Sequence, residues 1–450
     1  MQPRGTDAIP LPPRPNLEQY RHRAKSLVKA CASGDADAVR SWARGWLESL
    51  GALHDENRSA EADAVETPRY LKWTEIDREI DAIEKDARSS RLIDGDGDAS
   101  CTLADAQLFI ARLHDFASWP RFVHHLEALE RESSPDSAFE TAADAVVTGD
   151  IARLSSMLRT NPALSHARSA RDHAATLLHY IAANGHEGYR QKTPKNAVDI
   201  ARVLLDAGAE PDALARMYGY ECTPMQMLVS SAHPHIAGLQ VALVDILVDY
   251  GARPSGVNDD GSPLMTAFRF HYPRAAEALV RRGARVDNVI SAAALGRTDL
   301  LADWVVDGAT LAPDVHLAAV PWPRLKRDAR IHLGYALTWA ANWGKGDAVE
   351  LLLQKGVDPN GKDDDATALH FAAAFGHMDI VRLLLAYGAS LETLNSYDGT
   401  VLDGTLWYAY NDPVKGVHYA AVIRALIDAG ARTDVYPEMQ HWIDEYLKRG

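Results

Sequence analysis

One short phrase recurs along the chain: an apolar helical segment, two further residues, then a glycine usually followed by alanine, as in LLDAGAEPD and LLAYGASLE. The glycines of the seven copies are Gly208, Gly251, Gly283, Gly308, Gly356, Gly388 and Gly430. Glycine at the end of a helix can adopt positive φ, which lets the chain turn sharply into an extended segment. The phrase therefore predicts consecutive helix-pair units, each stacked on its neighbours.

The clearest copy runs from Thr367 to Ser390 and reads TALHFAAAFGHMDIVRLLLAYGAS. Thr367 is a suitable cap for a first helix, Gly376 marks its end, and the apolar residues that follow give a second helix its buried face. At these residues the chain closely resembles the ankyrin-repeat family. Weaker copies begin at Ala142, Thr176, Thr223, Ser262, Val289, Ala336 and Thr400. The resemblance implies an all-α solenoid of about eight helix-pair units, covering residues 138–436.

Helices of a different kind are expected on both sides of the repeats. Residues 1–16 are rich in proline and are expected to form a flexible tail. Residues 17–132 are expected to form an N-terminal helical domain of four or five amphipathic helices, and residues 437–450 a capping helix. The predicted caps of the N-terminal helices are Asn16, Asp35, Thr67, Thr102 and Ser118. Because a solenoid exposes an apolar face at each end, we expect these helices to cover the two ends.

Departures from the repeat period locate inserted segments. Residues 187–196, 233–240 and 411–418 lengthen three units between their two helices. A fourth insertion, residues 311–332, contains several prolines and is expected to interrupt the solenoid before Leu333.

Composition excludes several classes of protein. The chain of 450 residues has 47 Lys plus Arg and 62 Asp plus Glu, a net charge of −15, and shows no basic stripe, so nucleic-acid binding is not expected. No signal peptide or membrane span is expected, and its three cysteines form no disulfide or zinc pattern. The segment ADAQLFIARLHDFASWPRFVHHLEAL also resembles sequences that precede ankyrin units in bacterial proteins. We therefore expect a cytoplasmic, bacterial, monomeric protein with no membrane contact.

No catalytic motif, cofactor-binding motif or metal-binding helix is present, and no catalytic residue, cofactor or metal is expected. The nearest match is an acidic loop at residues 94–105, which has aspartates at calcium-loop positions but Ala99 where the turn needs glycine. A solvated loop is the preferred interpretation. His179 and His370 belong to the T-x-L-H phrase, and the resemblance implies a structural role for them.

The resemblance also implies where a protein partner binds. In ankyrin proteins the residues just before the turn between the two helices face a concave groove, and the loops between repeats carry further contacts. The predicted partner-binding residues are Arg269, Phe270, Leu295, Asn342, Trp343, Phe375, Trp407 and Tyr408 in the groove, with Tyr218 and Tyr220 in a loop. Equivalent positions in stacked repeats are neighbours, so Trp343, Phe375 and Tyr408 are expected to form one aromatic strip. The alternative is that these rings only cover the inner helices.

The insert of the second unit is chemically mixed. His186, Glu187, Tyr189, Arg190, Lys192 and Lys195 are its candidate ligand-binding residues. Such groups could grip a carboxylate or phosphate, or the tyrosine and arginine could pack onto the first repeats. The expected function is a protein-binding scaffold or regulator. The alternative is an enzyme or small-molecule receptor at the inserts of units two and three. A deep, closed pocket at these inserts would favour the enzyme or receptor, and an open groove would favour the scaffold.

Overall fold

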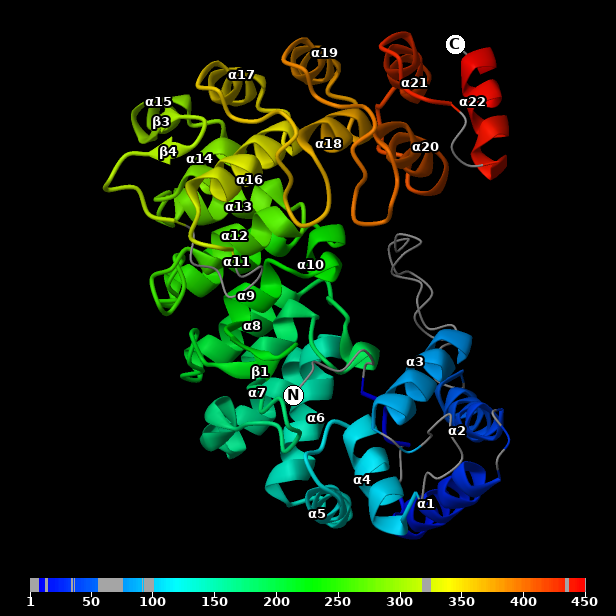
Figure 1. The fold of residues 1–450 in the computed structure, drawn as a ribbon. Helices are drawn as coiled ribbons and strands as arrows, with labels where there is room; N and C mark the ends of the chain where they lie inside the picture. Colours follow the sequence, from blue (N-terminus) through cyan, green and yellow to red (C-terminus); the bar gives the residue numbers. More distant parts are fainter. Residues whose placement is uncertain are drawn as a thin grey trace. The chain divides into compact units, whose positions relative to one another are not determined.

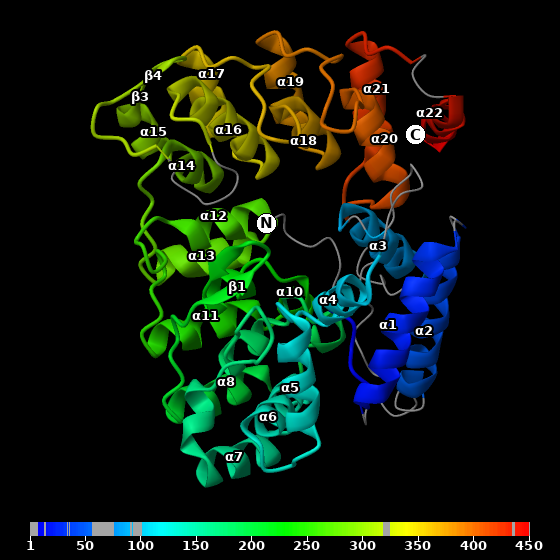
Figure 2. The ribbon, with the colours of Figure 1, turned by 60° about the horizontal axis from the view of Figure 1, so that its bottom comes forward.

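The computed structural model describes residues 8–12, 15–33, 35, 37–55, 76–90, 92, 101–317, 325–433 and 437–449. The chain divides into two compact units, shown as ribbons in Figures 1 and 2. The first unit comprises Met1–Val257 with Arg269–Arg282, and the second unit comprises Asn258–Phe268 with Gly283–Gly450. Both are mainly helical, as expected. Within the described residues, no helix combines the length and apolar character needed to cross a membrane.

The first unit opens with a helical segment made of α1 (Leu17–Ala32), α2 (Ala38–Asp55), α3 (Ile76–Ser89), α4 (Leu103–Leu113) and α5 (Trp119–Leu129). Helix α1 packs against α2 and α4, and α2 packs against α3. Their apolar faces meet in a core that includes Tyr20, Trp46 and Phe122. Asn16 caps α1 as predicted, because its side-chain oxygen accepts the Glu18 backbone N–H at 2.8 Å.

Other expectations for this segment have mixed outcomes. Thr102 caps α4 as predicted, in a reciprocal capping box with Asp105. This contact also accounts for one carboxylate of the acidic loop. The predicted cap Thr67 and the loop residues 94–98 lie outside the described part of the chain.

Part of the expected N-terminal tail is packed against the unit. Ala8 and Ile9 are buried. The Ile9 N–H donates to the Leu113 carbonyl at 2.8 Å, and the Ile9 carbonyl accepts from Nδ1 of His114 at 2.7 Å. The Ala8 N–H donates to the His186 carbonyl at 2.5 Å. This short stretch therefore joins α4 to the insert of the second repeat.

The rest of the first unit consists of repeat elements. They are α6 (Pro135–Thr148), α7 (Ile151–Thr160), the 3₁₀ helices η3 (Pro162–His166), η4 (Leu177–Ala182) and η5 (Gly188–Arg190), α8 (Ala197–Asp206), the strands β1 (Ala215–Met217) and β2 (Tyr220–Cys222), α9 (Pro224–Leu228), α10 (Ala232–Ile236), α11 (Gln240–Asp249) and α13 (Pro273–Arg281). Strands β1 and β2 form an antiparallel hairpin. Successive repeats stack through α6 with η4, η4 with α9, and α11 with α13.

The second unit holds most of α12 (Ser262–Arg269), then α14 (Val289–Leu295), α15 (Thr298–Trp304), β3 (Val305–Asp307), β4 (Thr310–Leu311), α16 (Ala329–Asn342), α17 (Gly346–Gln354), α18 (Ala368–Ala374), α19 (Met378–Ala386), α20 (Val401–Asn411), α21 (Tyr419–Asp428) and α22 (Pro437–Arg449). Helices α14, α16, α18 and α20 form an inner row, and α15, α17 and α19 an outer row (Figures 1 and 2). The insertion at residues 311–332 does not interrupt the inner row, because α14 packs directly on α16. Helix α22 packs against α20 and α21.

Six of the seven recurring glycines have the predicted positive φ, from 85° at Gly356 to 101° at Gly430. Gly308 is the exception, and the prediction of a helix-ending turn there is wrong. Helix α15 ends at Trp304, and the next residues form the β3–β4 hairpin. The β-branched pair at 305–306 favours a strand at this point.

Gly308 is nevertheless required by close packing. A Cβ atom at this position would overlap the backbone carbonyl of Gly356 at the end of α17. We therefore expect Gly308→Ala to lower the melting temperature of the second unit, with a cost of about 1–3 kcal/mol from overpacking. Gly388→Ala is a useful comparison because nothing lies within 4 Å of its Cβ, although its φ of 86° adds backbone strain. A Gly308→Ala protein with unchanged melting temperature would contradict the close approach.

Candidate functional site

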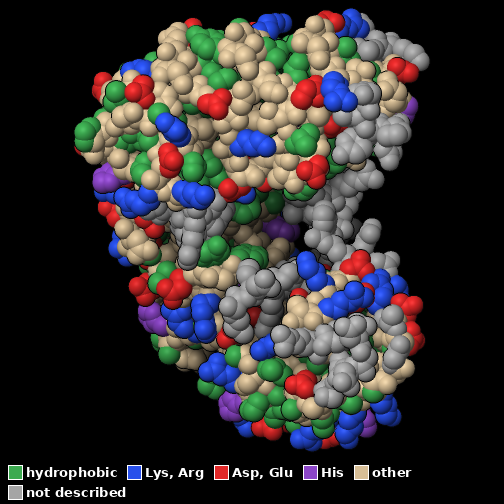
Figure 3. Space-filling view, in the orientation of Figure 1, with side chains coloured by type: hydrophobic (Ala, Val, Ile, Leu, Met, Phe, Trp, Pro, Cys, Tyr) green, Lys and Arg blue, Asp and Glu red, His purple; other side chains and the backbone are tan. Residues whose placement is uncertain are grey.

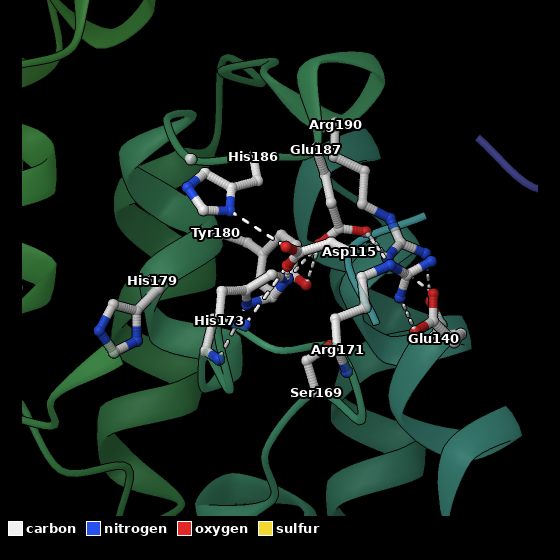
Figure 4. Close-up of polar contacts among 12 residues, drawn as sticks. Asp115, Glu140, Ser169, Arg171, His173, His179, Tyr180, His186, Glu187 and Arg190 are labelled. Atoms are coloured by element: carbon white, nitrogen blue, oxygen red, sulfur yellow. Dashed lines mark hydrogen bonds and ion pairs between the residues drawn. The ribbon is translucent and has the colours of Figure 1, made fainter. Parts of the chain in front are cut away.

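The insert of the second repeat folds inward onto the first repeats rather than projecting from them. Glu187 and Arg190, two of its candidate ligand-binding residues, are only 5% and 6% exposed. They meet Glu140 of α6 and Arg171 of the loop between η3 and η4 (Figure 4). These four residues form what we call the buried charge cluster.

The two cations and two anions of the cluster contact one another directly. Nη1 of Arg190 lies 2.8 Å from Oε2 of Glu140 and 2.9 Å from Oε1 of Glu187. Arg171 contacts Glu140 through Nη1 and lies 3.3 Å from Oε1 of Glu187 through Nε. His173 adds a further contact, because its Nε2 is 3.2 Å from Oε2 of Glu187. Each charge is therefore compensated inside the protein.

Electrostatics keeps the cluster ionised. Burial raises the pKa of Glu187, but Arg171 and Arg190 lower it more strongly, so that the pKa lies well below its usual value. The same two arginines lower the pKa of Glu140 against the effect of burial. Tyr180 donates its hydroxyl hydrogen to Glu187. The pKa of Tyr180 is raised well above its usual value, mainly because the group is buried and secondly because the Glu187 carboxylate is close. A paired carboxylate of this kind is stable as an anion at neutral pH.

The remaining insert residues divide into two groups. Tyr189 donates to Oε1 of Glu187 at 2.6 Å, and His186 lies 3.4 Å from Asp115 through Nδ1. Lys192 and Lys195 are exposed and lie outside this set of contacts. The cavity beside the cluster has a volume of about 10 Å³, which leaves space for no more than one water molecule. The arrangement corresponds to the alternative in which the tyrosine and arginine pack onto the first repeats.

The predicted partner-binding residues of the first unit lie at exposed edges. Tyr218 and Tyr220 in the β1–β2 hairpin are 39% and 36% exposed. Tyr218 has a φ of 53°, and its hydroxyl donates to the Asn184 side chain at 2.9 Å, which ties the hairpin to the insert. Arg269 is half-buried at the end of α12, and Phe270 after it is 41% exposed.

The predicted groove residues of the second unit do not all behave alike. Leu295, at the end of α14, is half-buried. Asn342 is only 8% exposed, so it does not present a groove surface as expected. Its carbonyl accepts from Nε2 of His377 in the following repeat at 3.1 Å, which fixes it against that neighbour. Trp343, at the end of α16, packs on Phe268 with ring centroids 5.9 Å apart.

Phe375, Trp407 and Tyr408 come together as an aromatic group. The Phe375 and Tyr408 rings are 5.7 Å apart, and the Trp407 and Tyr408 rings 5.2 Å apart. Tyr408 is not at the end of its helix as predicted, because α20 continues to Asn411. The reason is Ala409, which stands where the other repeats turn at glycine and favours continued helix.

A pocket of about 610 Å³ opens between α18, α20 and the loop at residues 395–399. We call it the aromatic pocket. Six of its lining residues are Asp365, Phe371, Asp403, Trp407, Tyr408 and Trp442. Trp407 is 48% exposed, and Tyr397 at the rim is 84% exposed. The volume is within the range of about 300–1,000 Å³ typical of ligand sites.

Three members of this pocket were not predicted from the sequence. Phe371 of α18 is half-buried and lines the pocket. Trp442 of α22 lines it and stacks its ring on Tyr410 at 4.4 Å. Asp403 lies three residues after Thr400, at the position where the phrases that begin at Thr176 and Thr367 have histidine. This difference from the other two phrases could have identified Asp403 from the sequence.

Charge elsewhere on the surface is mixed. On the face drawn in Figure 3, the described Lys and Arg side chains are interspersed with Asp and Glu rather than gathered by sign. Within the described residues, no group of three or more His, Cys, Asp or Glu side chains is arranged to hold a metal ion.

Comparison with known proteins places ankyrin repeats in both units. The family model for ankyrin repeats in three copies matches residues 323–398, and the single ankyrin-repeat model matches residues 175–216. These two matches support the all-α ankyrin-repeat fold expected from the sequence. The number of units and the boundaries of the domains stay predictions.

Curated proteins and solved structures match parts of this chain. The ankyrin repeat and KH domain-containing protein mask-1 of Caenorhabditis elegans is 27% identical over 45% of this chain and 7% of its own length. Serine/threonine-protein kinase 12 of Arabidopsis thaliana is 35% identical over 18% of each chain. The human ASB11 ankyrin repeat domain covers 65% of this chain and 98% of its own, with 18% identity and a TM-score of 0.34. The chain thus spans less than a fifth of the length of these two curated relatives.

Proposed function

We propose that this chain is a protein-binding scaffold or regulator and that its main binding surface is the aromatic pocket of the second unit. Ankyrin repeats indicate a protein-interaction scaffold. The observation that carries the proposal is a 610 Å³ pocket whose walls are rings that the core leaves partly exposed. Such a surface suits an extended peptide segment of a partner, because the pocket can take one side chain while the rim contacts its neighbours.

The expected energetics fit a protein interface. An aromatic side chain buries about 150–250 Å² when fully covered. At about 25 cal/mol per Å², the half of Trp407 still exposed contributes roughly 2 kcal/mol when a partner covers it. Interface energy is usually concentrated in a few such residues. Replacing Trp407 and Tyr408 should therefore weaken partner binding most.

The proposal is tested with a random peptide library displayed on phage and selected on the immobilised full chain. Wild type should enrich a defined set of peptides, and the Trp407→Ala, Tyr408→Ala double variant should bind them at least about a hundredfold more weakly, which is roughly 3 kcal/mol. Tyr387→Ala is the matched control, because Tyr387 is 43% exposed at the end of α19 and does not line the pocket. Enriched peptides that bind the double variant as well as wild type would contradict the proposal.

Two accompanying expectations concern the cell and the assembly. Cys31, Cys101 and Cys222 are all free thiols, which supports a reducing, cytoplasmic compartment. A bacterial source and a monomeric state are predictions of the sequence. Light scattering of the purified chain measures the oligomeric state directly.

A further inference from the structure

Asp403 occupies a position that other repeats give to a histidine with two partners. Nδ1 of His370 lies 2.8 Å from the Thr367 hydroxyl, and its Nε2 donates to the Gly399 carbonyl of the next repeat at 3.3 Å. His179 makes the same pair of contacts, with Thr176 at 2.9 Å and with the Cys222 carbonyl of its next repeat at 3.2 Å. Each histidine thus bonds its own threonine on one side and the following repeat on the other.

Asp403 reproduces only the contact with the threonine of its own repeat. Its Oδ2 accepts from the Thr400 backbone N–H at 2.8 Å and from the Thr400 hydroxyl at 2.7 Å. Its Oδ1 is buried and accepts no hydrogen bond from the described residues. The elements that follow α20 are α21 and the single helix α22, and neither supplies a hydrogen-bond donor to this oxygen among the described residues. A carboxylate side chain that is only 3% exposed therefore keeps one oxygen without a donor.

An unsatisfied buried oxygen is costly, by about 1–3 kcal/mol and more when the group is charged. A ligand that brings a hydrogen-bond donor to Asp403 removes that cost and gains the hydrogen bond. Because Asp403 lines the aromatic pocket, such a donor can enter from the pocket.

The rest of the pocket selects for positive charge. Asp365 is a second carboxylate on its wall, and the described residues that line it include no lysine or arginine. Burial lowers the pKa of His370 to about 4, so this lining histidine is neutral at pH 7. Phe371, Trp407 and Tyr408 also line it, and aromatic rings attract cations. The net charge of the chain, −15, adds long-range attraction for a basic partner.

We propose that the aromatic pocket takes an arginine side chain of the partner peptide, with its guanidinium donating to Asp403 and stacking on the neighbouring aromatic rings. Arginine suits this site better than lysine, because the planar guanidinium offers several donors in a fixed fork and stacks on aromatic faces, whereas the lysine ammonium is a strongly hydrated point charge. The inference rests on the proposed function and specifies which side chain the peptide must carry.

The test uses peptides obtained by display selection on the wild-type chain. We expect a conserved arginine among them, and replacing it by citrulline, which keeps the shape and loses the charge, should weaken binding in fluorescence polarisation at least about tenfold. Asp403→Asn should weaken the arginine peptide to a similar degree and should no longer distinguish it from the citrulline peptide. Asparagine can still accept from Thr400, so the helix cap is retained.

The controls separate this inference from the proposed function. Asp379→Asn removes the same charge from an exposed position on α19 in the same unit and should leave binding unchanged. The arginine site would be overturned by peptides that depend on Trp407 but carry no arginine, prefer lysine or tolerate citrulline. Such peptides would leave the proposed binding role of the aromatic pocket intact. Peptides whose binding does not depend on Trp407 would overturn the proposed binding role of the aromatic pocket itself. The citrulline comparison needs no variant protein, so it stands even if Asp403→Asn folds poorly.

Discussion

Replacing Arg171 by methionine should lower the free energy of unfolding of the first unit by about 3–5 kcal/mol, which is the usual cost of removing one partner from a buried ion pair. Arg171 and Glu187 have side chains that are only 2% and 4% exposed. Without Arg171, the carboxylates of Glu140 and Glu187 would share the single charge of Arg190, which also contacts Asp144. Little water can reach them, because the adjoining cavity of about 10 Å³ holds no more than one molecule.

Chemical denaturation monitored by circular dichroism measures this loss. Arg253→Met is the matched control, because it breaks an arginine–aspartate pair at a residue whose side chain is 58% exposed, and exposed pairs contribute about 0–1 kcal/mol. The double variant Arg171→Met, Glu187→Gln should recover part of the loss, since it restores the charge balance of the cluster. An Arg171→Met protein as stable as Arg253→Met would show that the cluster does not support the fold.

The sequence was sufficient for those features that depend on short-range chemistry. Helix caps such as Asn16 and Thr102 were predicted because one side chain and the next few N–H groups determine them. The turn glycines were predicted for the same reason, since positive φ is a local requirement. The prediction at Gly308 failed because its surroundings decide its role: the neighbouring valines extend the chain, and the Gly356 carbonyl, just after α17, approaches it.

The sites depend on residues that are distant in the sequence, and here the sequence was less informative. Glu187 and Arg190 were among the candidate ligand-binding residues of the insert, but their partners Glu140 and Arg171 come from other elements, so the pairing could not be read from the insert alone. The aromatic pocket was partly predicted through Trp407 and Tyr408. Trp442 completes it from the terminal helix, which no repeat register describes.

Three histidines should make the protein lose stability as the pH falls from 7 to 5. Burial lowers the pKa of His114 to about 3 and the pKa values of His179 and His370 to about 4, against an ordinary value of 6.5. His114 donates through Nδ1 to the Ile9 carbonyl. Its ring lies among Tyr20, Trp46 and Phe122, and its Nε2 has no hydrogen-bond partner among the described residues. A second proton there would place an unpaired N–H and a charge among those rings.

The direction of the effect follows from where the protons bind. Above pH 6.5 these histidines are neutral in both states and cost nothing. Below pH 6.5 the unfolded chain takes up their protons and the folded chain does not, so each histidine costs about 2 kcal/mol by pH 5. His114 and His179 both belong to the first unit, which should therefore lose about 4 kcal/mol. The pKa values of Glu140 and Glu187 are lowered from 4.5, so their own contribution is lost only at more acidic pH.

Denaturation curves at several pH values between 5 and 7 give the slope of stability against pH. His179→Gln should reduce that slope in the first unit by about one proton, or 1.4 kcal/mol per pH unit. Glutamine is a suitable replacement because Gln226 already forms the equivalent capping box with Thr223 in the next repeat. His22→Gln, at an exposed position on α1, serves as the control and should leave the slope unchanged. A wild-type slope near zero in this range would mean that the buried histidines accept protons in the folded protein, and it would contradict the neutral, single-donor role given to His114.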